Sequence, residues 1–211
     1  EDADTAGTGV PYLDVGYSAL PIPSDWVDLV IELDKSVSPS VLPVGAGGTA
    51  TFSLLVSSYD FPVDAVGLVD TLPAGWQYVS GSATITQPGP TTVIGPAADP
   101  DSITGSGTAL DPYVLSWTTS QLLGATTQMA PDETLTVAFD AVTTTSFALG
   151  ATSFNTSTAT GTRTVGSTTQ TFTTTSRAHI TFSDWTVGKT SNPDHSPVRP
   201  GDTIEYTVSI S

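Results

Sequence analysis

Residues 33–58 read LDKSVSPSVLPVGAGGTATFSLLVSS, and residues 187–211 start the same pattern again as VGKTSNPDHSPVRPGDTIEYTVSIS. From Lys35 and Lys189 onward the two stretches align without a gap at an offset of 154 residues, and seven of 23 positions are identical. Each copy has a lysine, a Pro- and Gly-rich link and then a run of alternating apolar residues. A repeat of this kind is typical of tandem structural units.

The repeat predicts how the chain is divided. We expect a complete unit at 26–183, because the second copy of the pattern opens directly after it. An irregular leader rich in Pro, Gly and Asp, or the end of a preceding unit, occupies 1–25. The segment 184–211 supplies the first strands of a second unit.

The apolar residues of the complete unit recur at every second position, which is the period of a β-strand with one buried face. Gly and Pro turns separate these short runs, and no stretch shows a helical period. The pattern predicts an all-β fold, an immunoglobulin-like β-sandwich. Three of the clearest runs are Leu29-Ile31-Leu33, Phe52-Leu54-Val56 and Leu135-Val137-Phe139.

Charge and composition exclude several classes of protein. The 211 residues include 21 acidic and 5 basic side chains, a net charge of −16, which disfavours nucleic acid and anionic membranes as partners. There is no cysteine, so disulfides and thiolate metal sites are excluded. No apolar run approaches the roughly 20 residues of a membrane helix, so we expect no membrane insertion.

Further motifs resemble one family. Three stretches resemble the domain-of-unknown-function-eleven repeat of prokaryotic surface proteins. They are DTLPAGW at 70–76, PGDTIEY at 200–206 and FNTSTAT at 154–160. That repeat also opens with Lys-Thr/Ser-x-x-Pro, as both copies here do. The chain departs from the family by an insertion around 88–112 and an extra hairpin after residue 160.

The resemblance implies an extracellular structural repeat, a stalk, spacer or filament subunit of a large prokaryotic surface protein or adhesin. It implies no enzymatic activity, and its partners would be neighbouring repeats or identical subunits. The expected location is the cell surface or a secreted filament. The alternative is a binding module, a glycan- or calcium-dependent adhesin or the accessory domain of a secreted hydrolase. For glycan binding, the candidate platform residues are Trp26, Trp76, Trp117 and Trp185.

Lys35 lies an even number of positions from the apolar residues before it, so its side chain should point to the same side of the strand, toward the core. An ammonium group in the core is costly unless it is paired. In the related pilin and collagen-adhesin domains, a first-strand lysine condenses with a last-strand asparagine, assisted by a buried acid. The matching residues are Lys35 and Asn155, with Asp70 or Glu133 as the acid. The hypothesis is an intramolecular isopeptide bond. The alternative is that Lys35 snorkels to the strand end and pairs with an ordinary carboxylate.

Two acidic stretches are weak calcium candidates. Calcium takes six to eight oxygen ligands, and neither stretch supplies enough of them alone. Solvated acidic loops are the alternative, and we expect no cofactor. The candidate ligands are Asp2, Asp4 and Asp14 in the leader, and Asp99, Asp101 and Asp111 in the insertion.

The last strand alternates apolar and polar residues but has no domain to join. An isolated pair of strands is marginal in water. Either the chain continues into a longer array, or the strand is donated to a neighbouring subunit. The residues that would be donated are Ile204, Tyr206, Val208 and Ile210.

Overall fold

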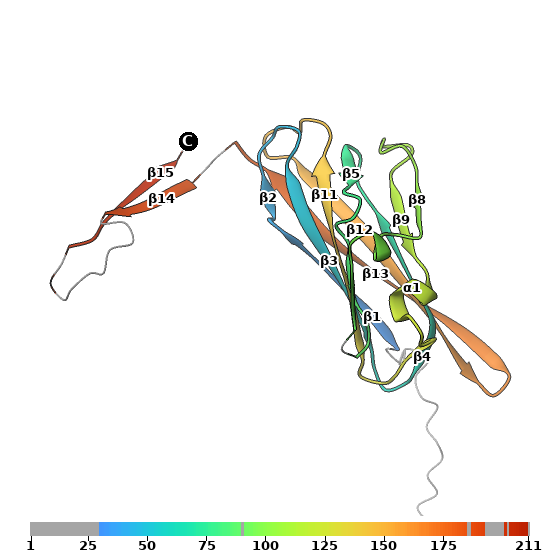
Figure 1. Cartoon of the computed structure of the whole chain (residues 1–211). Coiled ribbons are helices and arrows are strands. Elements are labelled where there is room, and N and C mark those ends of the chain that lie inside the picture. Colours follow the sequence, from blue (N-terminus) through green and yellow to red (C-terminus); the bar gives the residue numbers. More distant parts are fainter. Residues whose placement is uncertain (1–29, 90, 185–186, 193–200, 202, 211) are drawn as a thin grey trace, which may run out of the picture.

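The computed structural model describes residues 30–184 except 90, together with 187–192, 201 and 203–210. Two β-sheets stack on each other, and a two-stranded hairpin lies apart from them (Figure 1). The predicted all-β sandwich is confirmed. No described helix has the length and apolar character needed to cross a membrane.

The first sheet has the strand order β1-β3-β11-β6-β7, with β5 also paired to β11. All these neighbouring strands run antiparallel. Its strands are β1 (Ile31–Ser38), β3 (Thr49–Ser58), β5 (Trp76–Tyr78), β6 (Thr84–Thr86), β7 (Thr92–Ile94) and β11 (Thr134–Thr143).

The second sheet has the order β2-β13-β12-β4-β9-β8, with β10 paired to β4. The long β12–β13 hairpin extends beyond the rest of the sheet (Figure 1). Its strands are β2 (Val41–Leu42), β4 (Val63–Thr71), β8 (Ser102–Thr104), β9 (Val114–Trp117), β10 (Gln128–Met129), β12 (Thr152–Val165) and β13 (Thr168–Phe182).

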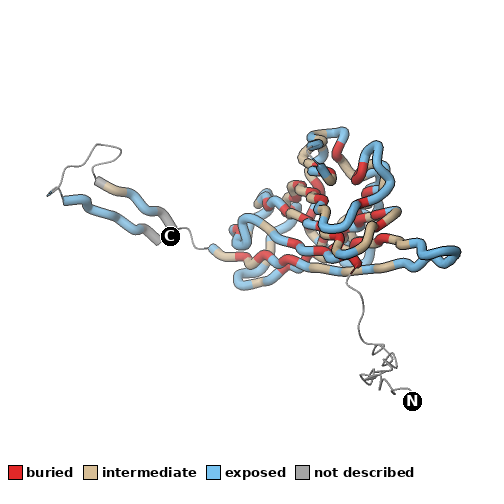
Figure 2. The backbone as a smooth tube through the Cα atoms, turned by 90° about the horizontal axis from the view of Figure 1, so that it is seen from below, coloured by how far each residue is buried: buried red, intermediate tan, exposed pale blue. Residues whose placement is uncertain are grey.

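Buried and exposed residues alternate along the strands, as Figure 2 shows. The core between the sheets is rich in aromatic rings, and Phe52 contacts both Trp76 and Phe139. The indole N–H of Trp76 donates to Ser153 Oγ at 3.0 Å, so this large side chain is buried with its polar atom satisfied. The indole N–H of Trp117 likewise donates to the carbonyl of Ala98 at 3.0 Å.

Two short helical turns were not predicted from the sequence. They are η1 (Gly95–Ala97) and α1 (Thr119–Leu123). The helix α1 buries Leu122 and Leu123 and ends at Gly124, whose φ of 62° suits glycine. Five residues are too few to show a helical period in sequence, so tertiary burial is what identifies this helix.

Close packing of neighbouring side chains explains the glycine at position 161. The pairing of β12 with β4 shifts register between Thr160 and Thr162. A Cβ at position 161 would lie 2.4 Å from Cγ1 of Val63 and 3.3 Å from Cδ1 of Ile31. We expect Gly161→Ala to lower the free energy of unfolding by about 1–3 kcal/mol through overpacking.

The matched control is Gly45→Ala, where an added Cβ meets nothing within 4 Å. This change should alter the free energy of unfolding by no more than about 0.5 kcal/mol. Denaturant unfolding of both variants checks the prediction, and equal midpoints would contradict it.

The separate hairpin consists of β14 (Val187–Asn192) and β15 (Glu205–Ile210), which pair antiparallel. The residues linking it to the sandwich, 185–186, lie outside the described residues, as do the leader 1–25 and its candidate calcium ligands Asp2, Asp4 and Asp14.

Candidate functional site: a buried lysine between the sheets

A charged pair lies inside the sandwich. Lys35, in the middle of β1, forms an ion pair with Asp70 on β4, and the side chains of both are 0% exposed. Lys35 Nζ also donates to Ser157 Oγ at 2.6 Å, and that hydroxyl donates to the Asp70 carboxylate. Lys35, Asp70 and Ser157 thus form a closed polar cluster.

Strand pairing places these groups. Asp70 and Ser157 are direct cross-strand neighbours on β4 and β12 of the second sheet. Lys35 comes from β1 of the first sheet, where its partner across the ladder is Leu54. The cluster therefore joins the two layers through their facing sides, deep in the apolar core.

Aromatic rings surround the lysine. Its Nζ lies 5.0 Å from the ring centroid of Phe52 and 5.9 Å from that of Phe139. Ring faces attract a cation, and this attraction is stronger when water is excluded. They do not replace the hydration of an ammonium, so the site remains a costly place for a charge.

Burial lowers the pKa of Lys35 below its ordinary value, although the charge of Asp70 and its hydrogen bond to Lys35 work in the opposite direction. Desolvation disfavours the charged form of an amine. The neutral amine is therefore more accessible here than at an exposed lysine. A neutral amine beside a carboxylate that can take up its proton is a nucleophile with its base.

Asn155 is a further buried polar residue on the strand that carries Ser157. It lies on β12 two residues before Ser157, so it shares the core-facing side of the strand at a Cα separation of roughly 7 Å. It is 1% exposed, and neither its side-chain oxygen nor its nitrogen has a hydrogen-bond partner among the described residues. The second carboxylate oxygen of Asp70 is also unpaired there. Unpaired buried polar atoms are rare enough to require an explanation.

Glu133 does not take part in this cluster. It precedes β11, is partly exposed, and its carboxylate accepts the backbone N–H of Ala130. Of the two acids predicted for the lysine, the structure brings only Asp70 to it. The snorkelling alternative differs from the structure as well, because Lys35 Nζ stays in the core instead of reaching the strand end.

Sequence reasoning missed Ser157. Its position two residues after Asn155 on an alternating strand was the available signal. In a segment dominated by Ser and Thr, however, nothing distinguishes this hydroxyl from those on the outer face.

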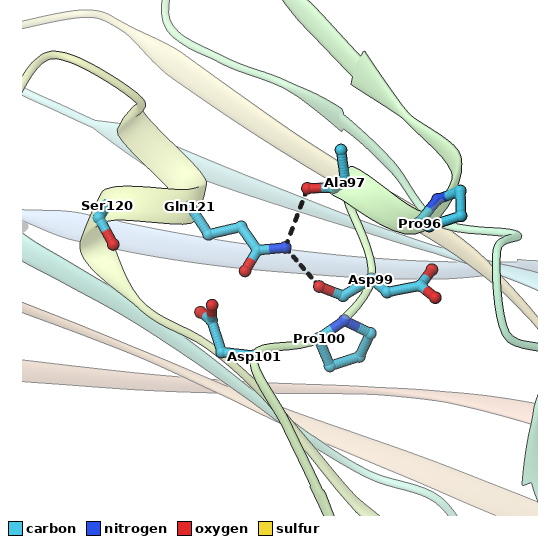
Figure 3. Close-up of a pocket in the computed structure, with 7 residues that line it drawn as sticks. All are labelled: Pro96, Ala97, Asp99, Pro100, Asp101, Ser120 and Gln121. Atoms are coloured by element: carbon cyan, nitrogen blue, oxygen red, sulfur yellow. Dashed lines mark hydrogen bonds between the residues drawn. The ribbon is translucent and has the colours of Figure 1, made fainter.

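The acidic insertion forms a shallow, open hollow of about 460 Å³ at the surface (Figure 3). Asp99 and Asp101 line it, and Gln121 donates its side-chain N–H to the carbonyls of Ala97 and Asp99. Asp111 is exposed and does not line the hollow. No group of three or more metal-ligating side chains occurs in the part of the chain that the structure describes.

The carboxylates of the hollow serve the fold. Asp99 accepts hydrogen bonds from the hydroxyls of Tyr78 at 2.6 Å and Ser80 at 3.0 Å, and from the N–H of Gly81 at 2.9 Å. Asp101 accepts the N–H of Thr118 at 2.6 Å. Both carboxylates thus fasten loops to the sandwich.

These hydrogen bonds predict a pH dependence. Burial by itself would raise the pKa of Asp99, but the bonds from Tyr78, Gly81 and Ser80 outweigh it and lower this pKa below the ordinary value of 3.8. A carboxylate whose pKa is lowered by folding stabilises the folded state at pH values above its unfolded-state pKa. This stability is lost as the pH falls from the unfolded-state pKa through the folded-state pKa. Wild type should therefore lose more stability than Asp99→Asn between about pH 5 and about pH 3.

Thermal unfolding across this pH range checks the prediction, with Asp60→Asn, at an exposed carboxylate, as the control. The control should follow the wild-type slope. If Asp99→Asn follows it too, the carboxylate does not stabilise the fold in this way.

The two described tryptophans of the candidate glycan platform are buried. Trp76 and Trp117 are core residues, 0% and 2% exposed, so they present no surface to a sugar. Trp26 and Trp185 lie outside the described residues. Exposed aromatic stacking at a loop end, which a binding module would need, is absent for the two described tryptophans.

Comparison with protein-family models finds no match, and comparison with curated sequences finds none either. The resemblance to the domain-of-unknown-function-eleven repeat therefore stays a sequence-based expectation. Among solved structures the chain is similar to BcpA, the major pilin subunit of Bacillus cereus, at 11% identity and a TM-score of 0.47, covering 75% of this chain and 41% of that one.

Two pilins of Corynebacterium diphtheriae are also similar. The major pilin SpaD has 12% identity and a TM-score of 0.46 over 75% of this chain and 35% of that chain. The major pilin SpaA, described as having stabilising isopeptide bonds, has 20% identity and a TM-score of 0.43 over 61% of this chain and 31% of that chain. The chain spans less than half the length of these proteins. Similarity at this level is a likeness of fold, and function is inferred below from the chain's own residues.

Proposed function

We propose that this protein is a non-enzymatic structural subunit of an extracellular fibre or stalk on a prokaryotic cell surface, and that an isopeptide bond between Lys35 and Asn155 locks its sandwich. The observation that carries the proposal is the fully buried Lys35–Asp70 pair, together with a buried Asn155 amide that has no hydrogen-bond partner among the described residues. Covalent joining would explain why these polar groups lie in an apolar core.

The reaction needs only groups that are present. Asp70 takes a proton from the Lys35 ammonium, and the neutral amine attacks Cγ of Asn155. A new C–N bond forms, Asp70 passes its proton to Nδ2 and takes the second proton from the attacking nitrogen, and the bond from Cγ to Nδ2 breaks, which leaves Asp70 protonated. One ammonia departs, and the product is a neutral secondary amide. A buried charged amine and a free amide become one neutral group, which the core accommodates at lower cost.

The position of the bond suits a protein under tension. The described chain enters the sandwich at β1 and leaves it after β13. A bond from Lys35 to Asn155 would carry a pulling force directly from β1 to β12. The residues between them, which include most strands of both sheets, would then be shielded from the load. The charge of −16 would keep closely packed subunits soluble through mutual repulsion.

The intact mass of the denatured protein tests the proposal. For the chain of residues 1–211 we expect a mass lower than the sequence mass by one ammonia, and fragmentation should find Lys35 and Asn155 in one joined peptide. A mass equal to that of the sequence would refute the bond. Single-molecule extension tests the mechanical role, since the cross-linked sandwich should not release the 35–155 segment under force, whereas Asn155→Ala should release it.

A further inference from the structure

The tail hairpin has the same register as the first hairpin of the sandwich. Lys189 on β14 pairs with Val208 on β15, and Lys35 on β1 pairs with Leu54 on β3. Both pairs are related by the offset of 154 residues found in the sequence. The repeat is therefore present in the strand pairing as well as in the sequence.

The lysine environment repeats too. Nζ of Lys189 lies 4.3 Å from the ring centroid of Tyr206, and Nζ of Lys35 lies 5.0 Å from that of Phe52. Tyr206 and Phe52 have the same offset of 154. In both hairpins, a lysine on the first strand thus lies over an aromatic ring on the second.

The two hairpins differ in what covers them. In the sandwich, β11 pairs with the edge of β3 opposite to β1, and the second sheet covers the face that bears Lys35. In the tail, β15 pairs with β14 alone among the described strands, and Lys189 is exposed. Tyr206 and Val208 are 57% and 58% exposed. Figure 2 draws most of this hairpin in the pale blue of exposed residues. A lone strand pair with an open apolar face is marginal in water.

We infer that β14–β15 is the first hairpin of a second sandwich, and that Lys189 is the amine of a second isopeptide bond. The inference rests on the proposed function of Lys35. The partner is the remainder of a second repeat of this polypeptide, equivalent to residues 59–183. It supplies one strand along β15, and a second sheet that brings a carboxylate and an asparagine to Lys189.

The chemistry of the partner follows from the hairpin. Covering this face buries Lys189, and a buried ammonium requires a carboxylate as its counter-charge. The strand beside β15 should have apolar residues at alternate positions, as β11 has beside β3. With an asparagine as the carbonyl donor, the new amide forms with loss of one further ammonia.

Donation of this hairpin to a second copy of the same chain is the competing arrangement. In each copy the corresponding place is already filled by β1–β3, which is held by the buried Lys35–Asp70 pair. A donated hairpin would have to displace it. A fresh set of covering strands has no such cost, so the observations favour a second repeat.

Trypsin digestion of the denatured protein, isolated from the cells that make it, tests the inference. Trypsin cleaves after a free lysine but not after an acylated one, so an unmodified Lys189 releases the peptide 178–189. We expect this peptide to be missing, and Lys189 to be joined to an asparagine-bearing peptide from outside residues 1–211 of the same polypeptide.

Three results would overturn the inference. Release of the free peptide 178–189 while Lys35 is cross-linked would refute it and leave the proposed function intact. Both lysines free would refute the inference and the proposed function together. Lys189 joined to a peptide from residues 1–183 of another copy would establish donation instead of a second repeat.

A variant gives an independent measurement. Lys189→Arg keeps the positive charge but lacks the amine that forms the amide. In the same natural protein it should remove one ammonia loss from the intact mass and leave the Lys35 cross-link in place. An unchanged number of ammonia losses would show that Lys189 is not joined.

Discussion

Asp70→Asn will leave Lys35 and Asn155 unjoined, so the variant will lack the ammonia loss expected of wild type. The neutral amide cannot take the proton of the lysine, and it leaves the ammonium buried without a counter-charge. An unpaired buried charge costs about 3–5 kcal/mol. The missing cross-link, which would span 120 residues of sequence, removes about 5 kcal/mol more.

Together these losses approach the whole stability of a typical domain, about 5–15 kcal/mol. We therefore expect Asp70→Asn to unfold at a far lower temperature than wild type or to fail to fold. The double variant Lys35→Met with Asp70→Asn removes the unpaired charge, so it should fold while still lacking the bond. Asp34→Asn, on the exposed side of β1, is the control and should keep both mass and stability.

Mass spectrometry and calorimetry read out the two effects separately. An ammonia loss that persists in Asp70→Asn would show that this carboxylate is not the proton acceptor. A double variant as stable as wild type would show that no covalent bond contributes to stability.

Asn155→Ala is expected to have the second-largest effect. It removes the carbonyl that the amine attacks but keeps the Lys35–Asp70 pair and its hydrogen bond to Ser157. The loss of about 5 kcal/mol from the missing cross-link corresponds to a midpoint lower by about 10–20 °C for a domain of this size. In the chain of residues 1–211, the mass of this variant should equal that of the sequence without any ammonia loss.

The matched control is Thr156→Ala, the next residue on β12, which faces the other side of the strand. Its mass should show the ammonia loss, and its midpoint should stay within a few degrees of wild type. If Asn155→Ala unfolds at the same temperature as this control, the asparagine is not joined to Lys35.

Much of the fold could be predicted from local sequence, because a strand reports its buried face through a period of two. This rule predicted that Lys35 points inward. It also predicted that Asp70 lies on the same side of its strand as Val66 and Leu68. The short helix α1 could not be predicted this way. Its two buried leucines belong to a turn too short for a helical period.

The choice of acid shows where local pattern fails. In the sequence, Glu133 and Asp70 each lie an even number of positions from the apolar core residues of the neighbouring strand run. In the first sheet, however, Lys35 pairs with Leu54, and Leu54 pairs in turn with Val137. Glu133 lies four residues before Val137, which is roughly 13 Å along the strand direction. Glu133 also directly precedes β11, a strand of the sheet that contains Lys35, whereas Asp70 faces the lysine from the opposite sheet.

The sequence by itself determined the alternating strands, the inward lysine and the offset of 154 residues, since each depends on neighbours along the chain or on direct comparison of two stretches. Only the tertiary structure decided that Asp70 and Ser157 meet Lys35 from the facing sheet, and that Lys189 repeats the register of Lys35. Those contacts depend on how distant strands pair and how two sheets stack, and the period of a single strand contains neither.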